Sequence, residues 1–288
     1  MSDTLPRAIE SVLIQNYPNF ELIVVDDNNP DSDYRLKTEK LMQNYLKYDH
    51  VNYIKHDKNK NGSAARNTGA KNSNGDYIML LDDDDEFLQG KIKAQVEKME
   101  TLDNSWGASY TNYIRTKNGK FYDQSKESRE GYLLKQELMR DLFIQAGSNL
   151  MIRRKAYFEI GGFDESFQRN QDIEFTCRLL RKYKLAYVNH KGLIHHKYSK
   201  KLNLTHLEIT NHFIQKMEFY IDEFDLIDQN NIYNMLYLQN TRYLISKKKY
   251  LEACKYLSSK NISKRLFIKY LFHLINRRRK KSIYGFHK

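Results

Sequence analysis

The 288-residue chain has few cysteines, few prolines and no long hydrophobic run. Its two cysteines, Cys177 and Cys254, are too few for a disulfide framework and lack metal-ligand spacing, which fits a reducing cytosol. No segment approaches the roughly 20 apolar residues of a membrane-spanning helix. The N-terminus has no basic-then-apolar pattern of a signal peptide. These absences predict a cytoplasmic protein without a transmembrane segment.

Acidic residues are missing from the C-terminal part of the chain. Between Ala253 and Lys288 there is no Asp or Glu but there are eleven Lys or Arg, so this segment carries +11 of the net charge of +12. A basic tail of this kind indicates a surface for an anionic partner. Hydrophobic residues make up 40% of the chain and charged residues 29%, which is typical of a globular protein.

Short apolar segments alternate with helical patterns up to about residue 198, and the rest of the chain is helical in pattern. The alternation predicts an α/β fold with a mostly parallel sheet flanked by helices. The strands are expected near residues 21–25, 51–55, 77–81, 108–114, 120–123, 149–152, 185–188 and 193–195, and the main helices near residues 5–15, 34–47, 63–71, 88–102 and 171–183.

The most informative segment is Tyr77 to Asp85, where five apolar residues end in four consecutive carboxylates. Such an apolar run predicts a buried strand. Packed like charges repel, so they need a cation or full solvation. In α/β proteins ligands bind at the carboxyl ends of parallel strands, and a divalent metal shared with phosphate suits such a site. A solvated acidic turn is the plainer alternative.

Three further features lie before and after this acidic segment in the chain. Asp26 and Asp27 follow an earlier apolar strand, and Asp172 begins a later helix. Between the two acidic turns lies Asn61 to Gly69, whose small residues allow close backbone approach and whose Arg66 can meet a phosphate bidentately. On residue type alone, Asp172 is better explained as a carboxylate that stabilises a helix N-terminus.

Taken together, these motifs resemble the family 2 glycosyltransferases of GT-A fold, of the bacterial surface-polysaccharide type. The resemblance covers residues 5–198 and leaves out the helical tail. The motifs that carry it are Val24-Val25-Asp26-Asp27, Ala65-Arg66-Asn67-Thr68-Gly69, Gly75-Asp76-Tyr77-Ile78, Leu81-Asp82-Asp83-Asp84-Asp85, Arg153-Arg154, Gly161-Gly162-Phe163-Asp164-Glu165 and Gln171-Asp172-Ile173-Glu174-Phe175 with Arg178.

The resemblance implies roles for particular residues. Asp27 matches the residue that contacts the uracil of a nucleotide-sugar, and Arg66 belongs to the donor site. Asp82 and Asp84 match the ends of the Asp-x-Asp motif, which implies that Asp84 binds Mn²⁺ or Mg²⁺ directly, with Asp82 and Asp83 near the ribose and the metal's waters. Asp172 matches the catalytic base. Gln171 stands where the family more often has Glu.

His195 follows the last strand of the matching region, where some GT-A enzymes supply a metal-ligating histidine. A surface or core histidine is the alternative. Asn149 and Ser148 either line the acceptor cleft or satisfy a turn.

One departure concerns the start of the chain. The family usually begins with a central strand, whereas this sequence begins at or just before the first helix, so a sheet edge is expected to lack its partner. Three explanations are open: the natural start lies upstream, the chain is a fragment, or it is a degenerate and poorly active relative.

We therefore expect a catalytic domain over residues 1–198 without its usual first strand, and a basic helical extension over residues 199–288. The expected activity is inverting transfer of one sugar from a nucleotide-sugar, with a UDP-sugar favoured, to a glycan or lipid-linked acceptor in capsule or lipopolysaccharide synthesis. A sugar nucleotidyltransferase and an inactive membrane-associated relative are the alternatives.

The tail suggests where such an enzyme would work. Arg265, Lys269 and His273 form one polar stripe on a mostly apolar helix, and a basic cluster follows it. Residues 262–288 therefore suit an anionic membrane surface, which implies a peripheral location at the inner face of the cell membrane. Packing on the catalytic domain with a solvated basic end is the alternative. No nucleic-acid partner is expected, because no defined binding module is present.

Overall fold

The structure, a computed structural model, describes residues 4–167, 170–197 and 206–286. These residues fall into two compact units. The first unit consists of residues 4–122, 128–132 and 144–197, and the second of residues 123–127, 133–143 and 206–286. The predicted domain boundary, between residues 198 and 199, lies outside the described residues.

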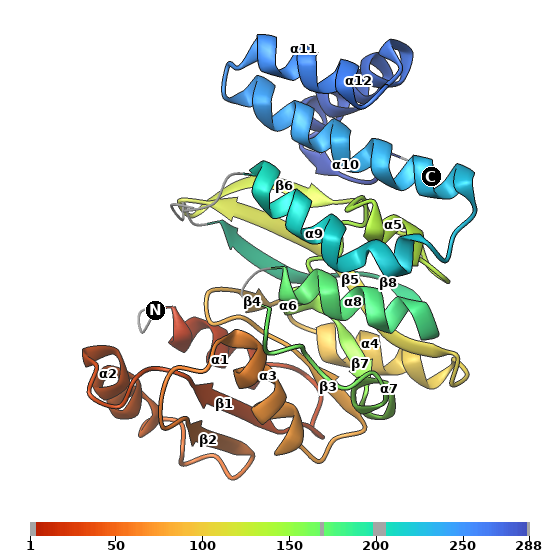
Figure 1. Ribbon diagram of the computed structural model, residues 1–288. Coiled ribbons are helices and arrows are strands. Elements are labelled where there is room, and N and C mark those ends of the chain that lie inside the picture. Colours follow the sequence, from red (N-terminus) through yellow and green to blue (C-terminus); the bar gives the residue numbers. More distant parts are fainter. Residues whose placement is uncertain (1–3, 168–169, 198–205, 287–288) are drawn as a thin grey trace. The chain divides into compact units, whose positions relative to one another are not determined.

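The first unit alternates strands and helices, so the predicted α/β class is confirmed (Figure 1). Its elements, in chain order, are α1 (Leu5–Leu13), β1 (Leu22–Asp26), α2 (Asp33–Met42), β2 (Val51–Lys55), α3 (Gly62–Lys71), β3 (Tyr77–Met79), β4 (Glu86–Phe87), α4 (Lys91–Glu100), β5 (Trp106–Lys117), α6 (Ala146–Asn149), β7 (Met151–Arg153), α7 (Arg154–Glu159), α8 (Gln171–Lys182) and β8 (Lys184–Lys197).

The strands of this unit form two sheets. β1 and β2 pair in parallel. In the second sheet, β7 lies between β3 and β5 and is antiparallel to both. β8 runs parallel to β5 and antiparallel to β4. The pairing is therefore mixed, and the chain between β3 and β4 is the segment Leu80 to Asp85, where the four carboxylates lie.

β1 has an unpaired edge in the described part of the chain, because β2 is its one strand partner there. Its four apolar residues, Leu22 to Val25, are half-buried, whereas Asp26 at its end is 3% exposed. α1 covers part of this sheet, since Ile9 packs with Met42 and Val51 in one apolar core. The absence of the usual first strand from the catalytic domain stays a prediction.

Two predicted elements differ in the structure. Asn149 ends the short helix α6 instead of beginning a strand, because its Nδ2 donates to the carbonyls of Thr111 and Ile144, both at 2.7 Å. The two short strands expected at residues 185–188 and 193–195 are one strand, β8. β5 pairs along its whole length, and register shifts near Thr111 and Asn112 accommodate the intervening residues.

The second unit is mainly helical. Its elements are the end of β6 (Lys120–Ser125), α5 (Leu134–Leu138), α9 (His206–Ile221), α10 (Leu226–Ser246), α11 (Tyr250–Ser259), α12 (Lys264–Arg279) and β9 (Ser282–Ile283). Helix α10 packs against α9 and α11 and buries Ile232, Met235 and Leu236. β9 pairs in parallel with β6, and both carboxylate oxygens of Asp141 accept from the Phe286 amide. No helix in the described part of the chain combines the length and hydrophobicity that crossing a membrane requires.

Candidate active site

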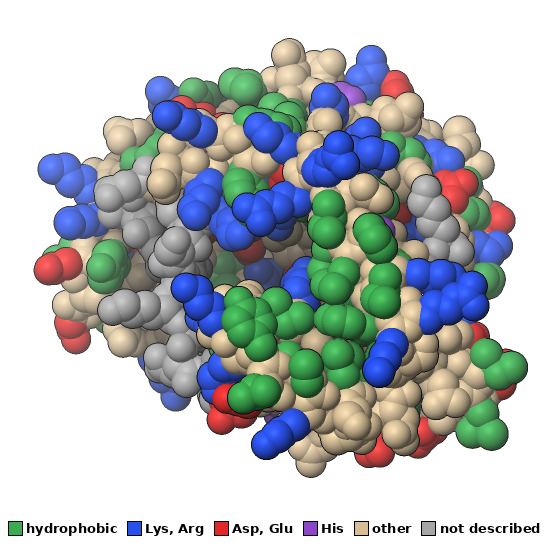
Figure 2. All heavy atoms as spheres, turned by 90° about the horizontal axis from the view of Figure 1, so that it is seen from above, with side chains coloured by type: hydrophobic (Ala, Val, Ile, Leu, Met, Phe, Trp, Pro, Cys, Tyr) green, Lys and Arg blue, Asp and Glu red, His purple; other side chains and the backbone are tan. Residues whose placement is uncertain are grey.

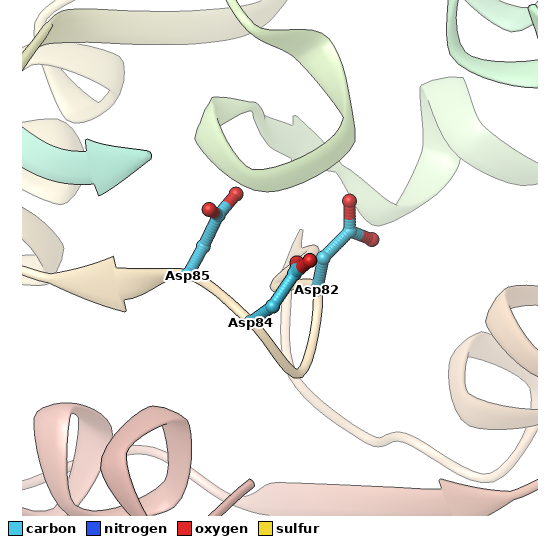
Figure 3. Close-up of side chains that lie close together, drawn as sticks. All are labelled: Asp82, Asp84 and Asp85. Carbon is cyan, nitrogen blue, oxygen red and sulfur yellow. The ribbon is translucent and has the colours of Figure 1, made fainter. Parts of the chain in front are cut away.

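The turn between β3 and β4 gathers three carboxylates. The Asp85 amide donates to the Asp82 carbonyl at 3.1 Å, which closes the turn. One oxygen each of Asp82, Asp84 and Asp85, here called the carboxylate cluster, lies within 4.8 Å of the others (Figure 3). The predicted pair Asp82 and Asp84 thus comes together. Asp83, also predicted, is half-buried and lies outside the cluster, and Asp85 is its third member.

Arg66 from α3 pairs with this cluster. Its guanidinium donates to Asp82 Oδ1 at 2.6 Å and lies over the Phe163 ring, 5.2 Å from the centroid. Although 38% of the Asp82 side chain is exposed, burial among protein atoms raises the pKa of its carboxyl. Arg66 opposes that rise, and the charges of Asp85 and Asp84 add to it. The site is thus short of positive charge even with Arg66 in place.

The cluster suits a divalent metal. Carboxylate oxygens are the ligands that Mg²⁺ and Mn²⁺ prefer. Three of them within 4.8 Å, one with a raised pKa, leave a mutual repulsion that such an ion would relieve. The residues therefore fit the metal that the sequence predicts, with Asp82, Asp84 and Asp85 as the available ligands.

His195 lies next to the cluster. Its Nδ1 is 3.0 Å from Oδ1 of Asp85, and the same oxygen accepts from the His196 amide at 3.1 Å. Asp85 is fully buried and His195 side-chain exposure is 24%. A proton on Nδ1 would satisfy Asp85 and leave Nε2 as the acceptor nitrogen, which is how metal-binding histidines are commonly oriented. The role of His195 as a metal ligand stays a prediction.

A chain of side chains connects the cluster to helix α8. Arg66 donates to Oε1 of Gln171 at 3.2 Å, and Nε2 of Gln171 donates to the Phe167 carbonyl at 2.7 Å. Asp172 is the next residue, in the first turn of α8. Asp172 is half-buried, and its carboxylate has no hydrogen bond or ion pair with any described residue. An unpaired carboxylate in this position can accept a proton from a bound molecule.

Asn67 holds α3 against the segment that leads to α8. Its Nδ2 donates to the Phe163 carbonyl and to Glu165 Oε1, both at 2.9 Å. Its Oδ1 accepts from the Phe163 amide at 2.8 Å and from the Tyr157 hydroxyl at 2.9 Å. Both donor hydrogens and the acceptor oxygen of the Asn67 side-chain amide therefore have hydrogen-bond partners. Gly162 has φ +69°, and a Cβ there would lie 2.6 Å from Asn67 Oδ1.

Asp27 organises the loop before α3. Its Oδ1 accepts from the Lys60 amide at 2.7 Å and its Oδ2 from the Asn61 amide at 2.9 Å. His56 Nδ1 lies 2.7 Å from Oδ1, and Nε2 of the same ring is 2.9 Å from the Thr68 hydroxyl. The carboxylate thus already has protein partners. Its predicted contact with uracil stays a prediction.

The short helix α6 contacts the carboxylate cluster at Asp82. The Ser148 hydroxyl accepts from the Asp82 amide at 3.1 Å, and a Cβ on Gly147 would lie 3.2 Å from Asp82 Oδ2. Ser148 and Asn149 are fully buried and hydrogen-bonded to protein, so they satisfy this turn rather than line a cleft. Asn149 Oδ1 accepts from the fully buried Lys91 at 2.6 Å.

Sequence reasoning missed part of this arrangement. It considered the run of four aspartates but not the turn that selects Asp85 over Asp83. It noted Gln171 as a departure but not its bond to Arg66. The small residues Gly147 and Ser148 were the available signal for the close approach to Asp82, because small side chains often mark such contacts.

The fold and the site together define an α/β protein with an acidic turn beside its sheet and, at a nearby helix start, a carboxylate that has no partner among the described residues. The chain belongs to glycosyl transferase family 2. The model of that family matches residues 2–161, which is more than half of the 288 residues.

Similar proteins extend this assignment. An uncharacterized glycosyltransferase of Rickettsia bellii is 29% identical over 273 residues, covering 90% of this chain and 37% of the relative. The GalNAc(5)-diNAcBac-PP-undecaprenol beta-1,3-glucosyltransferase of Campylobacter jejuni is 29% identical over 173 residues, covering 58% of this chain and 52% of the relative. The chain spans 18% to 66% of the length of the curated relatives it matches.

A solved structure confirms the fold. The crystal structure of S. aureus TarS residues 1–349 in complex with UDP-GlcNAc has a TM-score of 0.62 at 16% sequence identity, covering 84% of this chain and 69% of TarS 1–349. At this identity the likeness shows the fold alone, which is of the GT-A type.

Proposed function

We propose that the protein is a metal-dependent, inverting glycosyltransferase that moves one sugar from a UDP-sugar to an acceptor hydroxyl. The observation that carries the proposal is the link from the carboxylate cluster through Arg66 and Gln171 to the start of α8, where the Asp172 carboxylate has no hydrogen bond or ion pair with the described residues. The site for the sugar donor and the catalytic base Asp172 would thus be connected by direct side-chain contacts. The UDP-GlcNAc bound to the TarS structure supports the choice of donor.

Each group has a chemical role in this proposal. A divalent cation on Asp82, Asp84 and Asp85 would neutralise charge on the departing diphosphate. Arg66 would hold the diphosphate oxygens. Asp172 takes the proton of the acceptor hydroxyl as that oxygen bonds to the anomeric carbon and the bond to the diphosphate breaks. One displacement from the opposite face inverts the configuration.

The acceptor is proposed to be a glycan or a lipid-linked saccharide in capsule or lipopolysaccharide assembly, with the protein at the inner face of the membrane. The name of the Campylobacter jejuni relative, an undecaprenol-linked glucosyltransferase, supports a lipid-linked acceptor. The basic segment at residues 262–288 supports a membrane location.

Calorimetry tests the donor site first. We expect Mn²⁺-dependent UDP binding by the chain, loss of that binding in Asp84→Ala, and no change in the control Asp49→Ala, whose exposed carboxylate lies outside the site. Absence of UDP binding by the folded parent would favour the inactive alternative, which the open edge of β1 supports.

Product analysis then tests the reaction. With a suitable donor and acceptor, Asp172→Asn should bind UDP normally but transfer sugar about 10² to 10⁴ times more slowly, because it lacks the base. Release of pyrophosphate in place of UDP would identify the nucleotidyltransferase alternative.

A further inference from the structure

Helix α12 carries an exposed apolar stripe. Ile268, Phe272 and Ile275 are 51%, 63% and 52% exposed, and their spacing of four and three residues puts them on one face. Tyr270, on the opposite side, is 3% exposed and forms the packed face of the helix. This differs from the sequence-based picture, in which Arg265, Lys269 and His273 form the polar side and apolar residues fill the rest.

Basic side chains border this stripe on both sides. At about 100° per residue, Arg265 and Lys269 fall on one flank, and Lys264 and Arg278 on the other. All four are exposed and have no ion pair with the described residues. Figure 2 views the molecule from the side at which α11 and α12 lie in Figure 1, and it shows hydrophobic side chains gathered beside groups of Lys and Arg.

From this pattern we propose that the exposed face of α12 lies in the plane of an anionic lipid bilayer. The apolar stripe would enter the boundary between headgroups and acyl chains, and the flanking cations would contact lipid phosphates. A solvated helix normally presents a polar outer face, whereas the exposed face of α12 has an apolar centre between its cationic flanks. The proposal extends the lipid-linked acceptor named above, but vesicle binding needs no donor, so the two can fail separately.

Two other occupants fit the face less well. A second copy in a symmetric dimer would bring the same cationic flanks together, and no acidic residue between Ala253 and Lys288 would offset them. A single-stranded nucleic acid needs several aromatic side chains on which its bases can stack. The stripe of Ile268, Phe272 and Ile275 supplies one, Phe272, and is otherwise aliphatic.

Vesicle flotation of the full chain tests the proposal. We expect binding to vesicles of phosphatidylcholine mixed with phosphatidylglycerol, and at least tenfold weaker binding to phosphatidylcholine alone. Ile268→Ser/Phe272→Ser should lose the binding, as should Lys264→Gln/Lys269→Gln. The control Ile227→Ser changes an isoleucine on α10 that is 73% exposed, and it should bind like the parent.

Circular dichroism must show that each variant keeps the fold of the parent. In Phe272→Trp, tryptophan emission should shift to shorter wavelength with the anionic vesicles but not with the neutral ones. Equal binding to both kinds of vesicle, or full binding by folded Ile268→Ser/Phe272→Ser, would overturn the proposal. So would a lipid-free dimer that Ile268→Ser/Phe272→Ser abolishes, or binding to nucleic acid but not to vesicles.

Discussion

At the scale of single residues, Arg66 is the most informative side chain. It donates to Asp82 and to Gln171 at once and therefore supplies positive charge at the edge of the carboxylate cluster, where the Arg7 guanidinium also donates to the Asp84 carbonyl at 2.8 Å. A bound metal would compete with that ion pair. Of the two side chains that accept from Arg66, Asp82 is a carboxylate and Gln171 is a neutral amide. A glutamate at position 171, the residue that the family more often has there, would give Arg66 a second carboxylate partner.

Arg66→Gln is expected to bind Mn²⁺ about twofold to fivefold more tightly in the absence of nucleotide, because a partly exposed ion pair of about 1 kcal/mol no longer competes for Asp82. The same variant should bind UDP more weakly, since it lacks the cation that meets the diphosphate. Calorimetry with Mn²⁺ alone, and then with Mn²⁺ and UDP, measures both effects.

Arg154→Gln is the matched control, because Arg154 donates to Ser73 outside the site. Unchanged Mn²⁺ affinity in Arg66→Gln would show that Arg66 does not compete with the metal.

The residue scale also shows the limits of sequence reasoning. Asp82 and Asp84 could be selected from their motif alone. The choice between Asp83 and Asp85 depends on the hydrogen bond that closes the turn and on the pairing of Asp85 with His195 from a strand far along the chain. Such long-range contacts have no local signal.

At the scale of elements, α4, β5 and α6 meet at a buried polar network. Lys91 at the start of α4 donates to the side-chain and main-chain oxygens of Asn149 and to the Thr111 hydroxyl. Burial holds the pKa of the Lys91 ammonium well below its ordinary value. The network holds α6, and with it Ser148, against Asp82 of the carboxylate cluster.

Lys91→Met should remove a pH dependence of stability. In the unfolded chain Lys91 takes up a proton below about pH 10.5, whereas in the folded chain its lowered pKa delays this uptake to a lower pH. Between these two pKa values the unfolded state binds more protons, so the free energy of unfolding of the parent decreases as the pH falls. The slope is about 1.4 kcal/mol per pH unit within that window. Urea unfolding of both proteins between about pH 7 and 9.5 should give the parent the steeper slope.

Lys93→Met serves as the control, because Lys93 is an exposed lysine two residues away on the same helix. Equal slopes in the parent and in Lys91→Met would contradict this account.

The elements also show which predictions the sequence supports. Strands with strong apolar runs and helices with clear spacing, such as β1, β2, α3 and α8, lie within a few residues of their predicted bounds. The strand predicted at residues 149–152 is present as β7, but it begins at Met151, because the buried polar contacts of Asn149 override the local pattern at its predicted start. The prediction of two separate strands in place of β8 was wrong because β5 pairs with β8 on both sides of its polar middle, where register shifts accommodate the residues without a partner.

At the scale of the whole molecule, the two sheets of the first unit differ in how well they are covered. β1 is half-buried and has one open edge, whereas β5 lies between β7 and β8 and buries most of its first eight residues. Amide hydrogens exchange by local opening, which is easiest where apolar cover and ladder partners are few. The sheet of β1 and β2 should therefore be the least stable part of this unit.

Hydrogen–deuterium exchange should show faster exchange at Leu22–Val25 than at Ala108–Tyr113. Exchange of the latter should approach the limit set by global unfolding. Protection of Leu22–Val25 equal to that of Ala108–Tyr113 would mean that the open edge is covered in solution.

Gly162 and Asn67 together suggest how this molecule would respond to random substitution. A side chain at position 162 meets both a strained backbone, with φ +69°, and the occupied oxygen of Asn67 at 2.6 Å. At position 67, no other residue supplies two donors and an acceptor of the same length. In a library that replaces each residue in turn, these two positions should tolerate almost nothing, even though we assign neither of them a contact with sugar, metal or nucleotide.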